Sequence, residues 1–79
     1  MDRPTALNTV IAALRESGVK KEAIQESDQL GKNGLGLDET DIIDFFSRLQ
    51  NRGIYFADED SNKMITVKEV VDFIVDIDT

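Results

Sequence analysis

A chain of 79 residues has room for one small hydrophobic core, so we predict a single domain over residues 1–79. It contains neither Cys nor His, which excludes disulfides, the usual zinc sites, a thiol nucleophile and the commonest general base. No apolar run approaches the roughly 18 residues of a membrane span. We therefore expect a cytoplasmic protein without membrane contact that is not an enzyme.

The net charge of −7 arises entirely in the second half of the chain. Residues 1–37 contain five acidic and five basic residues, whereas residues 38–79 contain eleven acidic and four basic ones. An acidic surface repels the phosphate backbone, so nucleic acid is not an expected partner. A protein with a basic patch is expected instead, because opposite charges speed the encounter of two proteins.

The first helix is predicted from about Thr5 to Ser17, and Gly18 follows as its stop. Its apolar face has the spacing i, i+3, i+4 and i+7 and consists of Leu7, Val10, Ile11 and Leu14. Residues 19–37 are predicted to be a long loop, because glycines cluster at positions 31, 34 and 36. The apolar residues of this loop, which would hold it on the core, are Ile24, Leu30, Leu35 and Leu37.

The second helix is predicted to start at Asp38 as N-cap and to end at Gly53. Its buried face would consist of Ile42, Phe45, Phe46 and Leu49, with Ile43 alongside. Residues 58–63 would form one short helical turn. A T-x-x-E capping box at Thr66 predicts the last helix, whose apolar face would be Val70, Val71, Ile74 and Ile77. The predicted fold is an all-α bundle of three long helices and one short one, with a long first loop.

Residues 34–41 read G-L-G-L-D-E-T-D, which resembles the G-L-G-L-D-S-L-D motif of acyl carrier proteins. The resemblance covers nearly the whole chain. G-V-K at residues 18–20 is similar to the family's sequence after its first helix. Residues 56–74 are similar to the family's I-P-D-E-…-K-…-T-V-…-D-Y-I ending. The resemblance implies an acyl-carrier-like bundle.

The serine that carries 4′-phosphopantetheine in this family is replaced by Glu39. A carboxylate would be repelled by the pyrophosphate of coenzyme A, and the acyl phosphate it could form would be hydrolysed. We therefore expect no cofactor. Thr40 places a hydroxyl one residue further on, turned by about 100° on a helix. A genuine carrier that uses Thr40 as an unorthodox attachment site is the alternative.

The function that the resemblance implies is therefore non-covalent docking. The partner would be a synthase or transferase of fatty acid, polyketide or peptide synthesis that carries a basic patch, and the module itself would be a monomer. The expected docking residues are acids on the second helix and the short turn: Asp38, Glu39, Asp41, Asp44, Asp58, Glu59 and Asp60. Phe45 and Phe46 stand where the family has smaller aliphatic residues, and we expect both to fill the core.

A calcium-binding module of EF-hand type is a further alternative. Residues 58–69 place Asp58, Asp60, Asn62 and Glu69 at loop positions 1, 3, 5 and 12. Lys63 stands at position 6, where the sharp turn requires Gly, and adds a positive charge beside the ion. The same residues fit a short third helix and a capped fourth helix, so we expect no metal.

Overall fold

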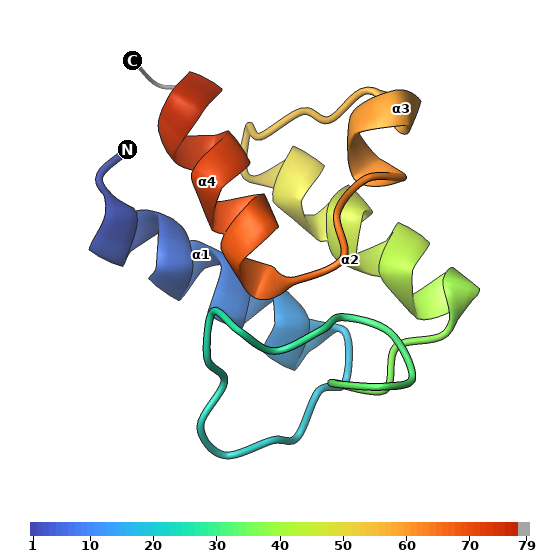
Figure 1. Cartoon of the computed structure of the whole chain (residues 1–79). Helices are drawn as coiled ribbons and strands as arrows, with labels where there is room; N and C mark the ends of the chain where they lie inside the picture. The colour runs from blue at the N-terminus through green and yellow to red at the C-terminus, as the bar shows by residue number, and fades with distance from the viewer. Residues whose placement is uncertain (78–79) are drawn as a thin grey trace.

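The computed structural model describes residues 1–77, and in this range the chain forms four helices and no strand (Figure 1). The helices are α1 (Arg3–Glu16), α2 (Glu39–Asn51), α3 (Asp58–Ser61) and α4 (Val67–Ile77). Helix α1 packs against both α2 and α4. The predicted all-α class is confirmed for these residues. None of their helices is long and apolar enough to cross a membrane.

Helix α1 starts two residues earlier than the apolar pattern predicted. The carboxylate of Asp2 accepts a hydrogen bond from the backbone N–H of Thr5 (2.9 Å) and so caps the helix. Pro4 lies in the first turn, where a missing N–H costs no intrahelical bond. The start of α1 is therefore set by its cap and its proline, and not by its first apolar residue.

The buried face of α1 is centred on small residues. Its fully buried residues are Ala6, Val10, Ala13 and Leu14. Leu7 and Ile11, which we predicted on this face, are only partly buried and pack at its margins. The alanines face inward because α1 lies between two helices, where a small side chain allows close approach.

Helices α1 and α2 end at the predicted glycines. Gly18 and Gly53 adopt φ angles of +102° and +87°. The next residue, Val19 or Ile54, donates its N–H to a carbonyl five residues earlier (3.0 and 3.1 Å). Both side chains are buried, so each helix end directs the following chain onto the core.

The long loop between α1 and α2 is fixed on the core and on the start of α4 (Figure 1). Its predicted apolar residues are buried, with Leu35 only partly so: Ile24, Leu30, Leu35 and Leu37. The carbonyls of Asp28 and Glu26 accept hydrogen bonds from the N–H groups of Val67 and Lys68 (2.9 and 2.8 Å). Two N–H groups that a helix cannot satisfy internally thus find acceptors in the loop.

The predicted capping box of α4 is present. Thr66 N–H donates to a carboxylate oxygen of Glu69 (3.1 Å), and Glu69 N–H donates to the Thr66 hydroxyl (3.3 Å). The buried face consists of Val67, Val70, Val71 and Ile74. Ile77, predicted on this face, is 52% exposed and borders a surface hollow together with Ile54 and Ile74.

Arg3 connects three parts of the chain through its guanidinium group. It donates to Asp72 of α4 (2.6 Å) and to Glu26 of the loop. Hydrogen bonds from Lys68 and then from Arg3 hold the pKa of Asp72 below its usual value. Ion pairs this exposed contribute little each, but these three side chains connect elements that are distant in sequence.

We expect Gly34→Ala to destabilise the loop. A Cβ at this position would lie 2.0 Å from the backbone oxygen of Gln29, so the turn would have to shift. Overpacking of this kind costs about 1–3 kcal/mol, which lowers the melting temperature by at least about 4 °C in a domain of this size. Thermal unfolding followed by circular dichroism measures the change.

Gly31→Ala is the matched control. Nothing lies within 4 Å of a Cβ at Gly31, and its φ is not in the left-handed region. We expect an unchanged or slightly raised melting temperature. Equal losses for the two variants would contradict the close approach at Gly34.

Candidate functional site

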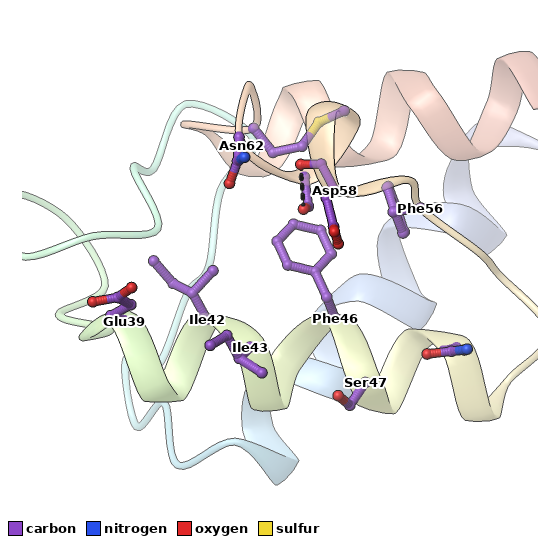
Figure 2. A pocket seen from close by; sticks show the side chains of 11 residues that line it. Glu39, Ile42, Ile43, Phe46, Ser47, Phe56, Asp58 and Asn62 are labelled. Atoms are coloured by element: carbon purple, nitrogen blue, oxygen red, sulfur yellow. Dashed lines mark hydrogen bonds between the residues drawn. The ribbon is translucent and has the colours of Figure 1, made fainter.

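A surface groove of about 710 Å³ lies between α2 and the segment that contains α3 (Figure 2). Its apolar lining residues are Ile42, Ile43, Phe46, Phe56 and Met64. The other lining residues are polar or acidic: Glu39, Ser47, Gln50, Asp58, Ser61 and Asn62. The volume is in the range of ligand-binding clefts, and this is the larger of the two hollows described here.

Helical spacing explains the α2 wall of the groove. The lining positions on α2 begin at Glu39 and continue at i+3, i+4, i+7, i+8 and i+11, which is one face of an α-helix. Phe45 and Leu49 point to the other side, where both are fully buried in the core. One face of α2 therefore holds the bundle together while the adjacent face remains accessible.

Four phenylalanines connect the groove to the interior. Phe46 packs edge-on against Phe56, with ring centroids 4.9 Å apart, and Phe56 stacks on Phe73 at 4.5 Å. Phe45 lies 5.0 Å from Phe46. Our expectation that both helix-two phenylalanines fill the core is correct for Phe45 only. Phe46 is partly exposed, because α3 stands apart from α2 and leaves one side of the ring uncovered.

Glu39 is the first residue of α2 and lines one end of the groove (Figure 2). Its side chain is exposed, and its carboxylate has no hydrogen bond or ion pair within residues 1–77. Thr40 is also exposed but does not line the groove. The structure thus separates the two residues: Glu39 lines the groove, and Thr40 does not.

The predicted docking acids on α2 differ in their engagement. Asp38 caps the helix by accepting from the N–H of Asp41 (2.8 Å), and Asp41 accepts in return from the N–H of Asp38 (3.2 Å). Asp44 accepts from Arg48 (2.8 Å), and this bond holds the pKa of Asp44 below its usual value. These three carboxylates accept hydrogen bonds within the helix, whereas Glu39 accepts none among the described residues.

The acids of α3 are also free. Asp58, Glu59 and Asp60 form most of this short helix, and within the described residues their carboxylates accept no hydrogen bond and form no ion pair. Only Asp58 lines the groove. Of the seven predicted docking residues, the structure therefore leaves four carboxylates unpaired: Glu39, Asp58, Glu59 and Asp60.

Two residues of the calcium alternative lie in a helix, and a third caps one. Asp58 and Asp60 lie in α3, where the backbone is helical. The Glu69 carboxylate accepts hydrogen bonds from the backbone and the hydroxyl of Thr66 (3.1 and 3.2 Å). Among residues 1–77 no group of three His, Cys, Asp or Glu side chains is placed to hold a metal ion.

Sequence reasoning did not find the groove. The apolar pattern predicts Ile42 and Phe46 on the buried side of α2 with Ile43 alongside, yet Ile42 and Phe46 are only partly buried and Ile43 is 63% exposed. Ser47 and Gln50, polar residues in register with Glu39 on the helix, were the only available signal that this side is accessible. The opposite wall, with Phe56 and Met64, could not be inferred because it depends on how α3 folds back.

A comparison with protein-family models found no model that matches this chain.

We expect Asp38→Ala, which removes a helix cap, to lower the melting temperature more than Glu39→Ala, which removes an unpaired carboxylate. Loss of the N-cap costs about 1 kcal/mol, which lowers the melting temperature by roughly 4–8 °C. Glu39→Ala removes only a favourable charge near the helix start, with an expected change of at most about 2 °C. Thermal unfolding of both variants at neutral pH measures this. A loss at Glu39 as large as that at Asp38 would mean that Glu39 also has a structural role.

Proposed function

We propose that this chain is an acyl-carrier-like module that docks non-covalently onto an enzyme that recognises carrier proteins. The observation that carries the proposal is the free, exposed carboxylate of Glu39 on the first turn of α2, at the position of the family's attachment serine. The order of the helices, the long first loop and the short third helix support a carrier-like bundle.

The charges of this face favour a basic partner. Glu39, at the start of α2, and the acids of α3 have no internal cation within the described residues. Lys63, just after α3, forms no ion pair with them. Because these charges are not neutralised internally, they are available to a partner's Lys or Arg side chains, and they accelerate association at low ionic strength.

The chemistry of Glu39 supports docking without a covalent arm. A carboxylate keeps a negative charge where working carriers have a phosphodiester, but it forms no stable ester of that kind. An enzyme that recognises a carrier protein by its charge and shape would thus bind this chain without modifying it. The module would act as a scaffold, decoy or regulator of such an enzyme.

A competition assay tests the proposal. This chain is added in increasing amounts to a conventional acyl carrier protein and an enzyme that recognises carrier proteins, with a phosphopantetheinyl transferase, an acyltransferase and a ketosynthase each tried. We expect at least one reaction to be slowed at about 50 mM salt and restored at higher salt. Glu39→Lys and Glu59→Lys should each weaken the inhibition about fivefold or more.

Glu22→Lys serves as the control, because Glu22 is an exposed loop acid whose carboxylate has no partner within the described residues. It changes the net charge equally but should retain the inhibition. Absence of inhibition with all three enzymes, or equal effects of the three reversals, would contradict the proposal.

A further inference from the structure

The groove leaves an apolar surface uncovered. Ile43 is 63% exposed, and Ile42, Phe46, Phe56 and Met64 are only partly buried although they pack against the core. Single exposed apolar residues are ordinary, but here five line one depression. Methionine adapts its shape to different contacts, so Met64 adds a deformable wall.

The length of the groove along α2 suits a helix of about three turns. Its α2 wall extends from position 39 to position 50, which corresponds to about 16 Å or three turns. Ile43 stands at the rim of this wall (Figure 2), where an occupant larger than the groove itself would cover it. An amphipathic helix laid into a groove makes contacts of this kind through residues spaced i, i+3, i+4 and i+7.

The unpaired carboxylates that line the groove favour an occupant whose polar side is basic. Glu39 lies at one end of the α2 wall, and Asp58 lies on the opposite wall. Neither carboxylate has a partner within the described residues, and no Lys or Arg lines the groove. An occupant with acidic or neutral edges would leave both charges uncompensated, whereas Lys or Arg side chains can lie along the apolar walls and place their cations at the rim.

We propose that this groove binds a basic amphipathic helix of the partner, of about three turns. The apolar stripe of that helix contacts Ile43, Phe46 and Met64, and its flanking Lys or Arg side chains pair with Glu39 and Asp58. The inference rests on the proposed function and specifies the partner element that the docking face receives. The affinity then has an apolar contribution in addition to the contribution of the charge pairs.

Two synthetic peptides of about 18 residues test this proposal. One arranges Leu and Lys so that a helix has an apolar stripe, and the other has the same composition in an order that abolishes the stripe. Both are labelled, and their binding to the full chain is measured by fluorescence anisotropy. We expect the amphipathic peptide to bind at least tenfold more tightly than its isomer. Amide chemical shifts should change along residues 39–50 and 56–64.

Matched variants separate the apolar and charged contributions. Ile43→Ser should weaken binding of the amphipathic peptide about tenfold, whereas Ile65→Ser, at another exposed isoleucine (58%), should not. Glu39→Gln combined with Asp58→Asn should weaken binding and reduce its salt dependence, and Glu22→Gln should change neither. Circular dichroism confirms that each variant is folded.

Equal affinity for the two peptides, or no effect of Ile43→Ser, would overturn the inference. Binding of a long-chain alkylammonium ion without binding of the helix would overturn it as well and would assign the groove to a small cationic amphiphile. These outcomes would leave the proposed function intact if Glu39→Lys still weakens the competition with carrier proteins. Binding of the amphipathic peptide without any competition with carrier proteins would support the groove as a helix-binding site and contradict the proposed function.

Discussion

The hydrogen bonds between the long loop and the start of α4 hold the other parts of this fold in place. The loop carbonyls of Glu26 and Asp28 satisfy N–H groups at the first turn of α4, and Leu30 N–H donates to the carbonyl of Ile65 (2.8 Å). Leu30 is thereby anchored in the core, and its carbonyl accepts from Leu37 N–H (3.0 Å). This short closure holds Leu37 on the core, directly before the Asp38 cap at which α2 begins. The exposed position of Glu39 at one end of the groove is thus a consequence of how the loop is tied to α4.

The carboxylates of α2 and α3 fall into two groups, those engaged within the fold and those without a partner, which the net charge alone does not distinguish. Some carboxylates are used by the fold, since Asp38 and Asp41 cap α2 and Asp44 pairs with Arg48. Others, including Glu39 and the acids of α3, have no hydrogen-bond or ion-pair partner within residues 1–77 and contribute only a favourable charge near a helix start. Charge reversal at a capping acid would damage the helix and weaken docking indirectly. Reversal at the free acids breaks no hydrogen bond or ion pair among the described residues, which makes them the informative positions for binding experiments.

Much of the fold could be predicted from the sequence, because its signals are local. The cap at Asp38, the box formed by Thr66 and Glu69, and the terminal glycines each depend on residues within one turn. Periodicity identified which sides of the helices are apolar, but it could not tell which neighbour covers them. Ala6 and Ala13 were therefore missed as core residues. For the same reason the pattern predicts Phe46 in the core, although α3 leaves this side chain accessible beside the groove.

The proposed function requires that a carrier-like docking face has lost its covalent chemistry at one residue, Glu39. Intact mass spectrometry tests it most directly, after incubation of the native chain and of Glu39→Ser with coenzyme A and a broad-specificity phosphopantetheinyl transferase. We expect only Glu39→Ser to gain the mass of the arm. Gain of mass by the native chain, with peptide mapping to Thr40 or another hydroxyl, would contradict the loss of covalent chemistry. Failure of both proteins to react would contradict the carrier-like face itself.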